Sequence, residues 1–116
     1  MKIGAVIINR TKWIELLHNE NITDNNKFWL LNLIMIANFG GKDEYGHPAR
    51  GRIIGSKSGK KGISAAICYK MLDDTLNTQV INKHLDKLQE EGYITINTED
   101  KFPYVQINNY DDWASS

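Results

Sequence analysis

The sequence predicts one α+β domain, mostly helical, in which a helix-turn-helix is followed by a β-hairpin. Ile81, Leu85 and Leu88 recur at i, i+4 and i+7, so they form a single apolar stripe along one helix. Gly92 follows this helix, and beyond it the spacing of apolar residues changes to the alternation of a β-strand. A helix that leads directly into a hairpin is typical of a winged helix, and we expect that architecture.

Length and composition predict a single domain with no membrane segment. A chain of 116 residues, 41% of them hydrophobic, can build one core. The 14 basic and 14 acidic residues cancel, so the global charge favours no polyanionic partner. A single cysteine, Cys68, excludes an internal disulfide and suits a reducing compartment. The most hydrophobic window, 28–39, is shorter than the ~20 apolar residues of a transmembrane helix, so we expect a cytoplasmic protein.

Residues 1–41 are expected to hold one strand and two helices. Residues 3–8 are β-branched and apolar, and Asn9 or Thr11 is suited to cap a short amphipathic helix after them. A second helix is expected from about Asn26 to Asn38, ended by the glycines at 40–41. Apolar residues cover nearly its whole circumference, so it is either the centre of the core or part of an oligomer interface.

Residues 42–62 are rich in glycine and charge, which predicts a long, exposed and mobile connection with only a short strand at residues 52–54. Its second half is basic and contains no acidic residue, so it is a candidate for phosphate contacts. A nucleotide-binding phosphate loop is excluded. Gly55 and Gly59 are separated by three residues rather than four, and Lys61 replaces the required Ser or Thr after Lys60. A solvated linker with no partner fits the composition equally well.

Residues 63–91 contain the predicted helix-turn-helix, and residues 92–110 contain the hairpin, or wing. The first helix is expected at residues 63–72, the turn at residues 73–75, and the second helix at residues 78–91. In the hairpin, strands at residues 93–97 and 104–108 flank a turn-forming tetrad. Pro103, which donates no backbone hydrogen bond, indicates that the second strand is an edge strand.

The second helix of a helix-turn-helix enters the major groove of DNA, and residues near its N-terminus reach the bases. Gln and Asn can pair with adenine, and Lys can donate to guanine or phosphate. Asp86, Glu90 and Glu91 would repel phosphate, which restricts contact to the N-terminal half of this helix. An ordinary solvated helix has the same residue types. The candidate DNA-binding residues are Thr78, Gln79, Asn82, Lys83 and Lys87 on the helix, Lys101 and Tyr104 on the wing, and Arg50, Arg52, Lys57, Lys60 and Lys61 before them.

No catalytic, cofactor or metal site is expected. The three histidines lack the spacing of metal ligands, and His84 lies where packing accounts for it. Adjacent carboxylates such as Asp73 and Asp74 point apart and have no recognisable nucleophile or base beside them. The tryptophans and tyrosines more often serve packing than base stacking, and Tyr104 is the exposed aromatic most worth testing.

Several segments occur in a characteristic order: WIELL, FWLLNLIMIANF, RGRIIGS, TQVINKHLDKLQEEGYITI and VQINNYDDW. Together they resemble the N-terminal winged-helix domain of bacteriophage replisome organisers and related DnaD-type primosome proteins. The resemblance spans nearly the whole chain and includes Ala37-Asn38, Gly92 and Asn109-Tyr110. That family usually has a glycine in the turn of the helix-turn-helix, where this chain has aspartates, and it commonly adds a second helical region that this sequence lacks.

The sequence therefore predicts a non-catalytic protein of phage or mobile-element origin that binds double-stranded DNA, as a homodimer, in replication initiation. The replication role is implied by the resemblance. The alternative is a protein-interaction module that binds a host or phage replication, transcription or defence protein, which the zero net charge favours. A third interpretation is a small transcriptional regulator with the same fold.

Overall fold

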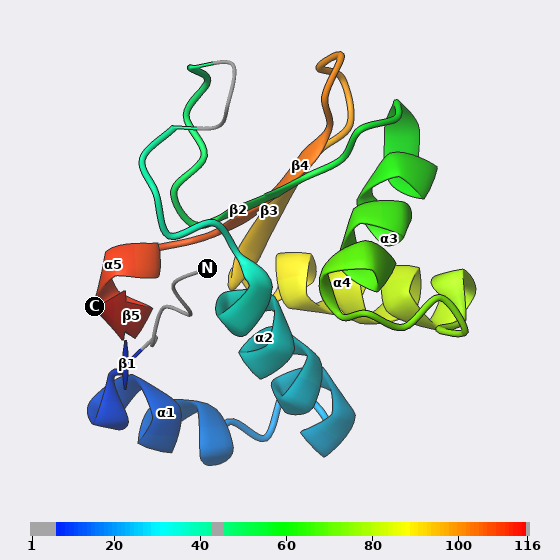
Figure 1. The fold of residues 1–116 in the computed structure, drawn as a ribbon. Helices are drawn as coiled ribbons and strands as arrows, with labels where there is room; N and C mark the ends of the chain where they lie inside the picture. Colours follow the sequence, from blue (N-terminus) through cyan, green and yellow to red (C-terminus); the bar gives the residue numbers. More distant parts are fainter. Residues whose placement is uncertain (1–6, 43–45, 116) are drawn as a thin grey trace.

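The computed structural model describes residues 7–42 and 46–115, and Figure 1 shows how their elements are arranged. The helices are α1 (Arg10–Leu17), α2 (Asp24–Ile36), α3 (Gly59–Lys70), α4 (Thr78–Glu90) and α5 (Tyr110–Trp113). The strands are β1 (Ile7–Ile8), β2 (Arg52–Ile54), β3 (Ile94–Asn97), β4 (Tyr104–Ile107) and β5 (Ala114–Ser115). Within the described residues, β2, β4 and β3 form an antiparallel sheet in that order, and β1 pairs with β5. The α+β class is confirmed; most of the strand expected at residues 3–8 lies outside the described residues.

Helix α2 begins and ends earlier than the sequence predicts. Thr23 caps it, because the Thr23 hydroxyl accepts from the Asn26 amide while Asn26 Oδ1 accepts from the Thr23 backbone. The helix therefore begins at Asp24. It ends at Ile36, since Ala37 already has an extended backbone with ψ 150°. The expected terminator at glycines 40–41 is wrong, because the chain leaves the helix before reaching them.

Lys70, the last residue of α3, stabilises the C-terminal end of α2. Its ammonium donates to the Ile36 carbonyl and to Asn38 Oδ1, both at 3.1 Å. A cation at this end also interacts favourably with the helix dipole. Burial lowers the pKa of Lys70. Asn38 continues from here toward the sheet, where its backbone N–H donates to the Arg52 carbonyl at 2.9 Å.

The prediction of a mobile loop over residues 42–62 is wrong for its second half. Helix α3 begins at Gly59 rather than at residue 63, and Ile53 of β2 is fully buried. A Cβ on Gly62 would lie only 1.8 Å from the Lys57 carbonyl oxygen, so glycine permits the chain to pass directly over the first turn of α3. Composition suggested a linker, but Gly62 allows the chain to pack closely against the start of α3.

Strand β4 is the central strand of the sheet, not an edge strand as Pro103 suggested. It pairs with β2 on one side, Ile53 opposite Val105, and with β3 on the other, Ile96 opposite Val105. Pro103 lies one residue before the strand, and its carbonyl accepts from the Gly55 N–H at 2.7 Å. Its missing N–H is therefore not needed by either ladder.

The core lies between one face of the sheet and helices α2, α3 and α4. Alternate residues of the strands, including Val105 and Ile107, point toward the helices and are fully buried. Leu30 on α2 is also fully buried, which makes this helix a centre of the core. The side of α2 that faces away from the core carries Phe28, which is 59% exposed, and Met35, which is 50% exposed. Among the described residues, no helix has the length and apolar character needed to cross a bilayer.

The turn between α3 and α4 places a non-glycine residue in the left-handed region. Leu72 has φ +55° and is 92% exposed, and no glycine occupies the turn. Asp73 follows, and its carboxylate accepts from the backbone N–H and the hydroxyl of Thr75 at 3.0 and 2.6 Å. The aspartate therefore organises the turn locally, while Leu72 takes the conformation that a glycine adopts at lower cost.

Candidate nucleic-acid interface

Helix α4 has the predicted apolar stripe and the predicted stop. Asn77 caps it by accepting from the Gln79 and Val80 amides at 2.9 and 3.3 Å. The stripe residues of this helix are buried, and Gly92 after it has φ +83°. Thr78, Gln79 and Lys83 are exposed on its N-terminal half. The residue types needed for major-groove contact are thus accessible on this part of the helix.

Asn82 is held between α3 and α4 rather than projecting freely. The Ser64 hydroxyl lies 3.1 Å from Asn82 Oδ1 and also 3.1 Å from the Lys60 carbonyl oxygen. Ser64 is buried, and it was given no role from the sequence because a lone serine carries no helix-contact signal. The contact fixes the first turns of α3 against the middle of α4.

The acidic residues of α4 are each paired with a lysine. Lys60 on α3 lies 3.3 Å from Asp86. Lys87 lies 3.3 Å from Glu91 and 3.9 Å from Glu90. Exposed pairs of this kind contribute little to stability, but they reduce the repulsion that these carboxylates exert on a phosphate. These ion pairs also engage Lys60 and Lys87, two of the lysines predicted to bind DNA.

Four of the predicted lysines have no ion pair to any residue that the structure describes, and three of them, Lys57, Lys61 and Lys83, lie on or next to α3 and α4, while Lys101 lies on the hairpin turn. Lys57 and Lys61 are exposed at the start of α3, and Lys83 is exposed on α4. The Lys60–Asp86 and Ser64–Asn82 contacts place the first turns of α3 beside α4. We call Gln79, Lys83, Lys57 and Lys61 the α3–α4 surface.

Arg50 has a local role. Its Nε and one terminal nitrogen each lie 2.7 Å from Asp111 Oδ1, and another donates to the Phe39 carbonyl at 2.6 Å. Its guanidinium also lies 4.5 Å from the centre of the Phe39 ring and 5.3 Å from that of Tyr110. Arg50 therefore joins α5, which lies apart from α4 in Figure 1, to the segment after α2.

Arg52, Tyr104 and Lys101 lie in a different place from the α3–α4 surface. Arg52 and Tyr104 alternate with the buried residues of β2 and β4, so they occupy the face of the sheet that points away from the helices. Lys101 is on the turn of the hairpin. Arg52 and Tyr104 therefore lie on the opposite face of the sheet from α4, whereas the Gly55–Pro103 hydrogen bond brings Lys101 close to the segment that leads into α3.

His84 is a packing residue on the side of α4 that contacts α2. Asn26 Oδ1 is used by the Thr23 cap, so its amide nitrogen faces His84 Nδ1 at 2.7 Å. This arrangement assigns an acceptor role, without a proton, to Nδ1. The imidazole also stacks on Trp29, with ring centroids 5.8 Å apart. Burial and the nearby Lys83 charge lower the pKa of His84.

Comparison with known proteins assigns no family, because no protein-family model, curated protein or solved structure matches this chain. The described residues contain no cluster of three or more His, Cys, Asp or Glu side chains able to hold a metal ion. The site's geometry therefore carries the functional argument.

Proposed function

We propose that this protein is a winged-helix protein that binds double-stranded DNA without catalysis. The order α2, β2, α3, α4, β3, β4 supports this, because a winged helix has a helix-turn-helix followed by a hairpin that shares a sheet with a preceding strand. Here α3 and α4 are the helix-turn-helix and α4 is the recognition helix. The residues from β3 to β4 form the wing.

The observation that carries the proposal is that Lys57, Lys61 and Lys83 on the α3–α4 surface are exposed and form no ion pair with any described residue. Cations that are not already paired gain most from a phosphate, and they release condensed counterions when DNA binds. The carboxylates on α4 have their own lysine partners, so the local field is more favourable than the zero net charge of the chain indicates.

Fluorescence anisotropy of a short labelled duplex across a salt series tests this function. Lys83→Glu should weaken binding and reduce the log–log salt slope by about 0.9 or more for the lost contact. Arg10→Glu makes the same charge change on exposed α1, away from α4 in Figure 1, and should leave both quantities unchanged. If wild-type protein shows no salt-sensitive binding at low ionic strength, the DNA proposal is wrong.

We assign the protein to replication initiation in phage or mobile-element DNA on the basis of its resemblance to replisome organisers. Action as a homodimer fits this role, since two copies double the DNA contacts. Exposed Phe28 and Met35 lie seven residues apart on one side of α2 and offer an apolar contact for a second copy. Light scattering should give a dimeric mass for wild type and a monomeric mass for Met35→Lys; a monomeric wild type contradicts the homodimer.

A protein-interaction module is the second candidate function. Tyr69, which is 81% exposed, and Leu72 favour it, because large apolar side chains at this exposure often mark a protein contact. Co-precipitation of one replication or transcription protein from host extract should then be lost in Tyr69→Ala and retained in Lys83→Glu. The opposite pattern would assign the interaction to the α3–α4 surface.

A further inference from the structure

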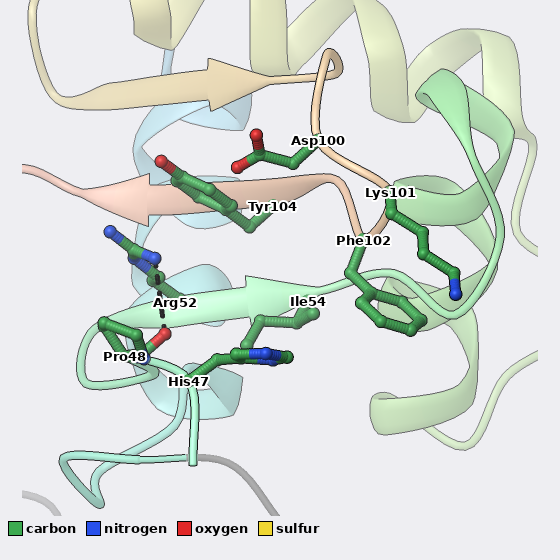
Figure 2. A pocket seen from close by; sticks show the side chains of 8 residues that line it. All are labelled: His47, Pro48, Arg52, Ile54, Asp100, Lys101, Phe102 and Tyr104. Atoms are coloured by element: carbon green, nitrogen blue, oxygen red, sulfur yellow. Dashed lines mark hydrogen bonds between the residues drawn. The ribbon is translucent and has the colours of Figure 1, made fainter. Parts of the chain in front are cut away.

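A cleft of about 400 Å³ opens between the segment that leads into β2 and the turn of the hairpin. Figure 2 shows its lining, with Arg52 and Pro48 at one end, Phe102 and Lys101 at the other, and Ile54 between them. The remaining lining residues are His47, Asp100 and Tyr104. Its size lies within the ~300–1,000 Å³ typical of small-ligand sites. Because it lies on the outer face of the sheet, the proposed duplex contact at α4 leaves it unused.

One wall of the cleft is a preorganised flat platform. The Arg52 guanidinium lies 4.0 Å from the centre of the Tyr104 ring. Arg52 is held there by hydrogen bonds from Nε to Gln106 at 2.8 Å and from a terminal nitrogen to the Pro48 carbonyl at 3.2 Å. The Tyr104 hydroxyl accepts from Asn97 at 3.3 Å. A ligand that stacks on this platform therefore does not have to order it first.

The other end of the cleft combines rings with a second cation. The ring centroids of His47 and Phe102 lie 6.4 Å apart with an interplanar angle of 38°. The Lys101 ammonium lies 5.6 Å from the centre of the Phe102 ring. The lining contains two cations, Arg52 and Lys101, and one carboxylate, Asp100, so it carries a net charge of one positive unit. Aromatic and guanidinium faces next to cations match a planar base linked to a phosphate.

From this geometry we propose that the cleft binds an unpaired nucleotide of single-stranded nucleic acid. The base stacks on the Arg52–Tyr104 platform or on Phe102, and the adjacent phosphate is attracted by Lys101. A base inside a duplex has both faces covered by its neighbours, so only an unpaired base can enter. The cleft shares no lining residue with the α3–α4 surface, but the Gly55–Pro103 hydrogen bond brings its Phe102 end near Lys57, so Lys83 on α4 is the residue that distinguishes this proposal from the duplex proposal.

Anisotropy of a short fluorescein-labelled oligothymidylate tests the proposal. Tyr104→Leu and Phe102→Leu, which keep an apolar side chain, should each weaken binding by about tenfold. Lys101→Glu should also weaken oligothymidylate binding, and because Lys101 is exposed, this substitution should leave the fold intact. Lys83→Glu is the matched control: it should weaken duplex binding and leave oligothymidylate binding unchanged. Circular dichroism of each variant checks that it remains folded.

A strand of the same length made of abasic deoxyribose phosphate separates base stacking from simple charge attraction. Wild-type protein should bind it at least about tenfold more weakly than oligothymidylate, because the platform contributes only when a base is present. Equal binding of the two strands overturns the proposal, and so does the absence of oligothymidylate binding at low ionic strength. Equal losses in Lys83→Glu and Phe102→Leu would move the contact to the α3–α4 surface, and the cleft assignment would be wrong.

Discussion

Replacement of Leu72 by glycine is expected to make the protein more stable. Leu72 has φ +55° in the turn between α3 and α4, and its side chain is 92% exposed. The left-handed conformation costs an ordinary L-residue roughly 1–2 kcal/mol, because Cβ approaches the following carbonyl oxygen. Glycine has no Cβ and avoids this cost. Because the Leu72 side chain is so exposed, its removal also loses few packing contacts.

The size of the gain follows from two opposing terms. Glycine gives the unfolded chain more freedom, which costs about 0.4–1 kcal/mol of stability. Subtracting this from the relieved strain leaves a net gain of roughly 0–1.6 kcal/mol, with a midpoint of about 0.8 kcal/mol. The backbone bonds of the turn, from Leu72 N–H to Tyr69 and from Asp73 N–H to Cys68, need no side chain at residue 72 and should persist. For a domain of this length the midpoint gain corresponds to a rise in Tm of about 3 °C.

Thermal and urea unfolding followed by circular dichroism measure the effect, and Leu72→Ala is the matched control. Alanine removes nearly the same side chain but keeps Cβ, so the strain should remain and the stability should change little. Leu72→Asn should fall between the two, since asparagine tolerates the left-handed region better than leucine. If the glycine variant is no more stable than the alanine variant, strain at Leu72 is not what limits this turn.

Three further predictions concern other positions. Gly62→Ala should destabilise the protein by about 3 kcal/mol, because its Cβ would collide with the Lys57 carbonyl. Urea unfolding measures this loss, and exposed Gly40→Ala is the control. A smaller loss of stability in Gly62→Ala than in Gly40→Ala would contradict the prediction. Lys70→Met should cost about 1–2 kcal/mol through its lost charged hydrogen bonds at the end of α2, and a neutral result in thermal unfolding would refute that role. Since burial lowers the pKa of His84, the unfolded chain binds more protons than the folded one below the ordinary value near 6.5. Stability is therefore complete above that pH and falls as the pH drops through it; urea midpoints from about pH 7.5 to about 5.5 should show this loss, and His84→Gln should remove it.

Local signals located most of the fold. The apolar stripe and Gly92 place the end of α4 within one residue of its observed end at Glu90, because helix periodicity and C-terminal glycines act over a single turn. The start of α3 could not be found this way. Gly62 has low helix propensity, and its place in the helix is explained by the close contact with the Lys57 carbonyl, which forms only on folding. Helix propensity is a property of one residue type and takes no account of another segment that packs against that residue in the folded protein.

The candidate site was predictable in residue type but not in arrangement. The sequence identified a basic segment, yet it could not indicate that Arg50 binds Asp111, 61 positions further along the chain. Nor could it indicate that Arg52 stacks on Tyr104 on the outer face of the sheet, because that face depends on the strand order. Whether a cation is available to a ligand depends on the residues that contact it in the folded protein. The spacing of residues along the sequence does not reveal these contacts.

The pairing of β1 with β5 has a mechanical consequence. Ile7 lies opposite Ser115 and Ile8 opposite Ala114, so the chain enters and leaves this short ladder at the same end. A force that pulls on the chain before Ile7 and after Ser115 loads the inter-strand bonds one after another, as in unzipping, rather than all at once. In a single-molecule pulling experiment the first extension should therefore occur at low force and release only these strands, with the β2–β4–β3 sheet and its helices yielding later.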